Sequence, residues 1–218
     1  MGPSRLTILV QSSRLKGRLK GSRLEASRDW SASAPTREGA LVKVWDLPLR
    51  LSHWAMACCV LIAWFTPNTY DALHRSAGYG VLALTLFRLV WGFVGTRYSR
   101  FQNPLRTFRV LPRYLWAIGR GRSRRYLGLN PAGRAMSITM LLLLAVSGIS
   151  GWMQVTLRFF GVAWVQDTHT YTSYAVILLA LVHVAGVVLM SIRQKENLVR
   201  AMVTGWKWTG GTRPGTPA

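Results

Sequence analysis

The side chains best suited to chemistry in this chain are its four histidines, His53, His74, His169 and His183. Imidazole is the commonest metal ligand among side chains, and its ordinary pKa lies close to neutral pH. His169 and His183 are 14 residues apart. On an α-helix they would lie about 21 Å apart along the axis and within about 40° of the same face. One helix carrying both residues would therefore serve two sites at different depths.

Four long apolar stretches are available to position these histidines. They cover roughly residues 47–66, 76–95, 132–155 and 172–192, and each approaches the ~20 residues that cross a bilayer as a helix. A soluble bundle would need charged faces on every helix, and these stretches lack them. The sequence therefore predicts an all-α membrane protein, a four-transmembrane-helix bundle with each histidine in a span or at its mouth.

The net charge of +21 is distributed along the chain in an alternating order. Residues 1–50 and 96–134 hold ten Lys and Arg each and residues 193–218 hold five, which accounts for 25 of the 28. Because basic residues favour the cytoplasmic side, both termini and the second connection are expected to be cytoplasmic. A nucleic-acid-binding module would have no reason to place its charge in this order, whereas contact with lipid headgroups is expected.

This topology sorts the histidines by depth. His74 and His169 fall near the outer face, and His53 and His183 fall in the inner half. Two axial imidazoles suffice for a haem, because the porphyrin supplies the other iron ligands. Zinc would need three or four protein ligands at one depth, and no Cys, Asp or Glu is placed to complete either pair. We therefore expect two b-type haems. For a single histidine, an isolated polar residue bonded to nearby backbone is the alternative, but four such residues would be costly in lipid.

Three further residues are consistent with haem sites. Gly78 follows His74 by four residues and Gly186 follows His183 by three, so each removes a side chain where a porphyrin would approach the helix. Ordinary close packing of helices is the alternative for both glycines. Arg88 lies deeper, toward the inner side, where its guanidinium is expected either to pair with the carboxylates of the inner haem or to reach the inner headgroups.

The remaining chain divides into a basic, disordered cytoplasmic tail over 1–41, the helical domain over 42–208 and a flexible end over 209–218. Within the second connection, residues 111–120 are expected to form a short amphipathic helix on the inner membrane surface, with Leu111, Leu115 and Ile118 facing lipid. The third span lacks histidine, and its Gly148 and Gly151 are expected at a close helix contact. Cys58 and Cys59 are expected to be packing residues.

Four segments resemble a known family. They are VWDLPLRLSHW (44–54), LHRSAGYGVLALTLFRLVWGFVGTRYSRF (73–101), YLGLNPAGR (126–134) and DTHTYTSYAVILLALVHVAG (167–186). The chain resembles bacterial cytochromes of the b561 type, especially the branch similar to the b-type cytochrome subunit of nickel-iron hydrogenases. One departure is Leu129, where close relatives are expected to have His in the inner loop.

The resemblance implies a four-helix cytochrome of the bacterial inner membrane with two haem b groups. Its ligand positions fall on His53, His74, His169 and His183. It also implies electron transfer between a redox partner, such as cytochrome c or a hydrogenase-like subunit, and quinone.

Three functional hypotheses follow. The first is an electron-transfer subunit with no bond-making chemistry. The second is a quinone-coupled oxidoreductase that acts directly on a small donor such as superoxide. The third is a haem-free transporter or scaffold. The outer connections are short and nearly uncharged, which favours a protein partner over an electrostatic funnel for a small anion.

Overall fold

The computed structural model of the protein describes residues 40–67, 71–101, 104–122 and 126–210. Within this part of the chain, Leu41–Thr209 forms one compact unit. The expected tail and flexible end fall almost wholly on residues 1–39 and 211–218, which lie outside the described residues. Their boundaries stay predictions.

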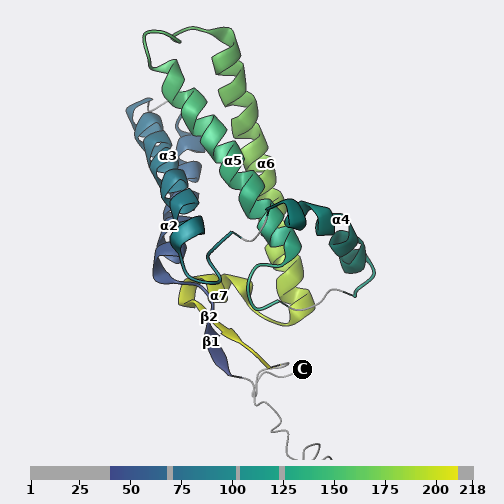
Figure 1. Ribbon diagram of the computed structural model, residues 1–218. Helices are drawn as coiled ribbons and strands as arrows, with labels where there is room; N and C mark the ends of the chain where they lie inside the picture. Colours follow the sequence, from purple (N-terminus) through teal and green to yellow (C-terminus); the bar gives the residue numbers. More distant parts are fainter. Residues whose placement is uncertain (1–39, 68–70, 102–103, 123–125, 211–218) are drawn as a thin grey trace, which may run out of the picture. The chain divides into compact units, whose positions relative to one another are not determined.

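The unit is mostly helical (Figure 1). Its elements in chain order are β1 (Leu41–Lys43), α2 (Leu47–Phe65), α3 (Asp71–Val94), α4 (Pro104–Gly119), α5 (Pro131–Gln154), α6 (Ala163–Gln194), α7 (Leu198–Thr204) and β2 (Trp206–Trp208). The helices α2, α3, α5 and α6 are long and apolar enough to cross a membrane. The four predicted spans are thus confirmed as helices.

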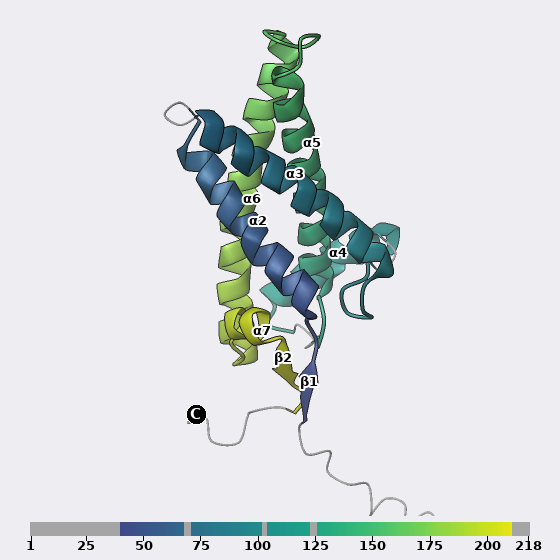
Figure 2. The ribbon, with the colours of Figure 1, turned by 90° about the vertical axis from the view of Figure 1, so that its left-hand side faces the viewer.

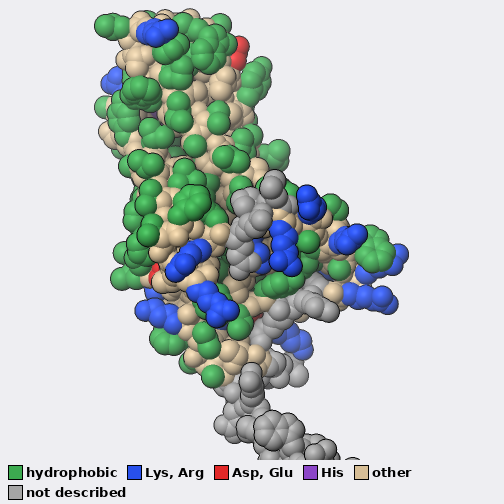
Figure 3. Space-filling model, viewed as in Figure 1, with side chains coloured by type: hydrophobic (Ala, Val, Ile, Leu, Met, Phe, Trp, Pro, Cys, Tyr) green, Lys and Arg blue, Asp and Glu red, His purple; other side chains and the backbone are tan. Residues whose placement is uncertain are grey.

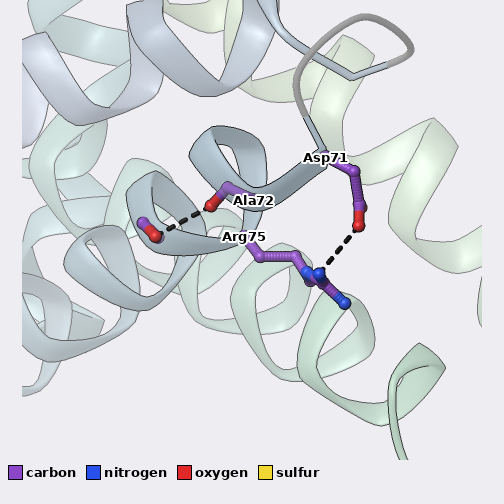
Figure 4. Close-up of polar contacts among 4 residues, drawn as sticks. Asp71, Ala72 and Arg75 are labelled. Carbon is purple, nitrogen blue, oxygen red and sulfur yellow. Dashed lines mark hydrogen bonds and ion pairs between the residues drawn. The ribbon is translucent and has the colours of Figure 1, made fainter.

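Two of these helices begin earlier than their hydrophobicity suggests. α3 begins at Asp71 and α6 at Ala163, whereas the apolar stretches begin near 76 and 172. At the start of α3, Asp71 pairs with Arg75 at 2.8 Å, and Ser76 Oγ donates to the carbonyl of Ala72 at 2.8 Å (Figure 4). A carboxylate in the first helical turn also complements the helix dipole. The earlier starts place His74 and His169 inside regular helix.

The long helices alternate in direction, and α5 packs on both α3 and α6 while α2 packs on α3 (Figures 1 and 2). Small residues permit two of these contacts. A Cβ on Gly148 of α5 would meet Leu82 Cδ1 of α3 at 3.2 Å, and one on Gly80 would meet Cys59 Sγ of α2 at 3.0 Å. Among the described residues, α6 has hardly any close backbone contact with α2 or α3.

The bundle is filled at mid-depth by an apolar cluster of Val81, Leu144 and Val176, with Val60 packed against it. Most large hydrophobic side chains instead face outward, and Leu178 and Leu181 of α6 are 66% and 65% exposed. Figure 3 shows such side chains over most of one face of the helices, with most Lys and Arg in the lower half of the view, around α4 and to its left. A surface this apolar requires lipid as its solvent.

A short antiparallel sheet joins the two ends of the unit, with Leu41 opposite Trp208 and Lys43 opposite Trp206. The amides of Val44 and Trp45 both donate to the carbonyl of Gly205, at 2.8 and 3.1 Å. Gly205 has φ +86°, and a Cβ there would lie 2.7 Å from the carbonyl oxygen of Trp45. The glycine is therefore required both by its backbone conformation and by the close approach.

Leu129 has a structural role beside this sheet. It packs against the buried cluster of Val44, Trp45, Leu49 and Ala201. The apolar residue at this position therefore contributes to the packing between the start of α2 and α7.

Asp46 fastens the start of α2 to the end of α3. Its carboxylate caps α2 by accepting from the Leu49 amide at 2.9 Å, and it also accepts from Trp91 Nε1 at 3.2 Å. Two hydroxyls complete the set, Thr96 Oγ1 at 2.6 Å and Ser99 Oγ. Partial burial alone would raise the pKa of Asp46, but these hydrogen bonds outweigh the burial and lower the pKa below its ordinary value.

The second connection differs from its prediction. α4 begins at Pro104 and continues through Pro112, so the helix is longer than the expected 111–120. Leu111 and Ile118 are half-buried rather than exposed to lipid, whereas Leu115 is 51% exposed. The face that carries Leu111 and Ile118 also carries the buried Tyr114, and it lies against the rest of the unit.

We expect Asp46→Ala to lower the stability of the purified protein by about 1–3 kcal/mol, because it removes a helix cap and leaves several donors without their acceptor. The measurement is thermal unfolding in detergent, with the exposed Asp71→Ala as the control, which should cost far less. Folding lowers the pKa of Asp46, so the stability difference between wild type and Asp46→Ala should be complete near neutral pH. It should shrink as the pH falls through the pKa of Asp46 in the folded protein. A difference that grows on acidification would contradict this role.

Candidate functional site

The four histidines lie on three of the long helices, His53 on α2, His74 on α3, and both His169 and His183 on α6. The ring centres of His74 and His169 are 6.2 Å apart, and those of His53 and His183 are 6.3 Å apart. The structure therefore brings together the two combinations that depth along the helices predicts. α6 contributes one member to each pair. The pair His74 and His169 is called the outer pair, and the pair His53 and His183 the inner pair, after the orientation that the charge distribution predicts.

In the outer pair, both rings are oriented by helix carbonyls. His74 Nδ1 lies 2.8 Å from the carbonyl of Ala63, and His169 Nδ1 lies 2.9 Å from the carbonyl of Ser147. Each Nδ1–H can donate to its carbonyl, which leaves Nε2 as the nitrogen free to bind a metal. The Ala63 carbonyl is available because the residue four positions later, Pro67, has no N–H to donate.

Gly151 allows the ring of His169 to lie against α5. A Cβ at this position would lie 2.9 Å from Cε1 and 3.0 Å from Nδ1 of the imidazole. Any side chain would therefore push the ring away from the Ser147 carbonyl. The close contact expected at Gly148 and Gly151 is present at both positions, and at Gly151 the neighbour is the histidine itself.

A cavity of about 460 Å³ adjoins the outer pair. It is lined by His74 and His169 together with apolar and small residues from all four long helices, among them Val60, Gly78, Leu144 and Ile177. A volume of this size is within the range of cofactor pockets. A Cβ on Gly78 would meet nothing within 4 Å, so the glycine leaves open space beside His74 rather than permitting a helix contact.

The inner pair has a different environment. His53 Nδ1 and Arg88 Nη1 are buried and have no hydrogen-bond partner among the residues that the structure describes. The guanidinium of Arg88 lies over the ring of Phe101, 5.7 Å from its centre. Gly186 faces open space in the same way as Gly78. Such groups are free to bind a ligand, an ion or a water molecule.

Two imidazoles with ring centres about 6 Å apart can hold one metal ion between them, because a bond from a metal to an imidazole nitrogen is about 2 Å long. Neither pair has a third ligand, since the described residues contain no group of three or more His, Cys, Asp or Glu that could hold a metal ion. This donor set fits an iron whose other ligands come from a porphyrin. It does not fit a zinc site.

Comparison with known proteins identifies the family. A family model described as prokaryotic cytochrome b561 matches residues 44–205. The chain belongs to the prokaryotic cytochrome b561 family. The protein is therefore a multi-pass protein of the bacterial inner membrane that transfers electrons by means of b-type haem. Membership excludes the haem-free transporter or scaffold.

Several curated relatives carry one name, "Probable Ni/Fe-hydrogenase B-type cytochrome subunit". The relative from Azotobacter vinelandii is 27% identical, with 82% of this chain and 93% of the relative covered. Those from Bradyrhizobium diazoefficiens and Rhodobacter capsulatus are 22% and 23% identical, covering 83% and 90% of this chain and 90% and 89% of their own lengths. These names agree with the branch that the sequence resembles. No solved structure matches the chain significantly.

Sequence reasoning missed the backbone groups that orient the outer histidines. The carbonyl of Ser147 carries no sequence signal, because every residue has one. The carbonyl of Ala63 could have been found, since a proline four residues later at a helix end marks a carbonyl without its helical partner. His74 lies on the next helix, within reach of that carbonyl.

We expect Gly151→Ala to displace the imidazole of His169 and to weaken haem binding about 10- to 100-fold, the usual cost of losing the partner that orients a metal-binding histidine. The measurement is b-type haem absorbance per chain after purification. Gly119→Ala is the matched control, because a Cβ at Gly119 meets nothing within 4 Å. Equal haem content in the two variants would show that the contact at Gly151 does not position the ring.

Proposed function

We propose that the chain transfers electrons across the membrane through two b-type haems, one bound by His74 and His169 and the other by His53 and His183. The observation that carries this proposal is the presence of two histidine pairs, with ring centres 6.2 and 6.3 Å apart, at two depths of the bundle. When bound, a b-type haem supplies one-electron redox chemistry at its iron.

At the outer pair, helix carbonyls fix the orientation of both rings. The carbonyls of Ala63 and Ser147 hold the Nδ1 atoms, so Nε2 of each ring would be the atom that binds the iron. Gly78 leaves space for a flat macrocycle beside α3. The apolar part of the lining of the adjoining cavity would keep water away from a bound haem.

At the inner pair, Arg88 is the residue that we assign to the haem carboxylates. Its Nη1 is buried and has no hydrogen-bond partner in the described part of the chain, and its guanidinium can bind a carboxylate in a bidentate manner. Gly186 leaves space beside His183 on α6. The same arrangement supports Arg88 as a pairing residue rather than one that reaches only to headgroups.

The apolar cluster at mid-depth lies between the two proposed sites. Val60, Val81 and Val176 each follow a histidine of their own helix, His53, His74 or His169, by seven residues, which is about 10 Å along the axis. Polar groups are costly at this depth, so the cluster keeps water out of the path between the two pairs.

The charge distribution supports an orientation in which both termini and the second connection are cytoplasmic, because 25 of the 28 basic residues fall there. His74 and His169 would then lie toward the outer face. Electrons would enter from an outer donor at this pair and leave at the inner pair toward quinone.

The relatives' printed name supports a hydrogenase-like subunit as the donor. The connection between α5 and α6 agrees, since Leu157 and Phe160 are 102% and 80% exposed and Arg158 is its single charged residue. Exposed apolar side chains of this kind suit a protein contact. Direct oxidation of a small anion such as superoxide would be helped by a cluster of basic side chains at the outer face. This connection has Arg158 alone, which favours a protein donor.

We expect the purified protein to hold two low-spin haems per chain, measured by pyridine haemochrome assay and reduced-minus-oxidised spectra. His74→Ala and His169→Ala should each remove one haem, and the two changes together should do little more than either alone, because both act on one site. His74→Ala combined with His183→Ala should abolish both. If that last combination spared one haem, the pairing would be wrong.

We expect a cysteine at position 160 to be labelled by an impermeant maleimide from outside intact cells, and a cysteine at position 122 to be labelled only after lysis. Phe160 and Arg122 are both exposed, so accessibility within the protein is matched. Both variants would carry Cys58→Ser and Cys59→Ala, so that the introduced cysteine is the one that reacts. The opposite labelling pattern would reverse the orientation.

A further inference from the structure

α4 is divided around its circumference into three sectors. At about 100° per residue, one sector holds Thr107, Leu111, Tyr114 and Ile118. Thr107 and Tyr114 are 2% and 8% exposed, and α4 packs on α5. This sector is the one by which the helix is attached to the bundle.

The second sector is apolar and exposed. Phe108, Leu115 and Trp116 are 43%, 51% and 60% exposed, and they lie within about 100° of one another around the helix. Nothing in the described part of the chain covers them. A helix of a soluble protein would bury such side chains, so this sector requires an apolar environment outside the chain.

The third sector is basic and adjoins the second. Arg106, Arg109, Arg113 and Arg120 lie within about 60° of one another, and all four are exposed. The guanidinium of Arg120 lies over the ring of Trp116, 3.7 Å from its centre. Residues 96–134 contain ten basic residues and no acidic one, so no carboxylate of this connection neutralises the sector.

α4 is held at one end of the membrane-spanning helices. Arg193, near the C-terminal end of α6, donates to the carbonyl of Ile118. Figure 1 shows α4 beside the N-terminal part of α5, and Figure 3 shows Lys and Arg side chains gathered there. The helix therefore lies near one end of the spans, where the chain is expected to meet the polar surface of the bilayer.

We infer that α4 binds anionic phospholipid, with the sector of Phe108, Leu115 and Trp116 in the acyl region and the arginine sector on the phosphate headgroups. A bilayer surface offers an apolar layer directly beside a layer of negative charge, which matches the two adjoining sectors. An acidic protein surface would match only the arginine sector. The inference is independent of the proposed haem ligands.

The test compares haem-loaded protein in neutral detergent with phosphatidylglycerol or phosphatidylcholine added. Bound lipid would be counted by native mass spectrometry, and the unfolding temperature would be measured in parallel. The test variant is Arg109→Gln with Arg113→Gln. The matched control is Arg97→Gln with Arg200→Gln, which removes the same charge from exposed positions outside α4. Leu115→Gln tests the apolar sector, and inorganic phosphate at the same concentration tests the headgroup alone.

We expect phosphatidylglycerol to bind and stabilise wild type and the control pair, and to bind the Arg109/Arg113 pair roughly tenfold more weakly. Leu115→Gln should also weaken binding, phosphatidylcholine should stabilise less, and added salt should reduce the effect. Equal lipid binding by the two arginine pairs would overturn the inference. That is also the result expected if α4 binds an acidic protein instead of lipid. Equal stabilisation by inorganic phosphate would overturn it as well.

Discussion

The structure depends on one constraint, the placement of two imidazoles 14 residues apart on α6. Because this helix contributes to both histidine pairs, its rotation and depth determine where α2 and α3 must present His53 and His74. α5 packs along α6, and its Gly151 lies against the ring of His169. The backbones of α6 and of the pair α2 and α3 hardly meet in the described part of the chain, and the cavity beside His74 and His169 is lined by side chains from these helices and α5.

The second constraint is that polar groups in lipid must have partners. The outer histidines meet it with two carbonyls, one of which is available because Pro67 ends the helical hydrogen bonding of α2. The inner pair does not meet it within the described residues, because His53 Nδ1 and Arg88 Nη1 have no hydrogen-bond partners there. Asp46 and Gly205 fasten the helix ends nearby, where water and headgroups can share their hydrogen bonds.

The spans, their number and the combinations of histidines could be predicted, because hydrophobicity over ~20 residues and helical spacing are strong signals. The early start of α6 at Ala163 could not, since the polar run QDTHT (166–170) separates its first turn from the apolar stretch. The β1 and β2 strands have three residues each, too few for an alternating pattern. The role of Asp46 depends on Trp91, Thr96 and Ser99, which are remote in sequence.

We propose that the two histidine pairs hold two separate haems. An electron cryo-microscopy map of the purified protein in a lipid nanodisc tests it most directly. We predict two planar densities, one between His74 and His169 and one between His53 and His183, with their irons about 21 Å apart along α6. A single density, or one spanning His74 and His183, would contradict the account.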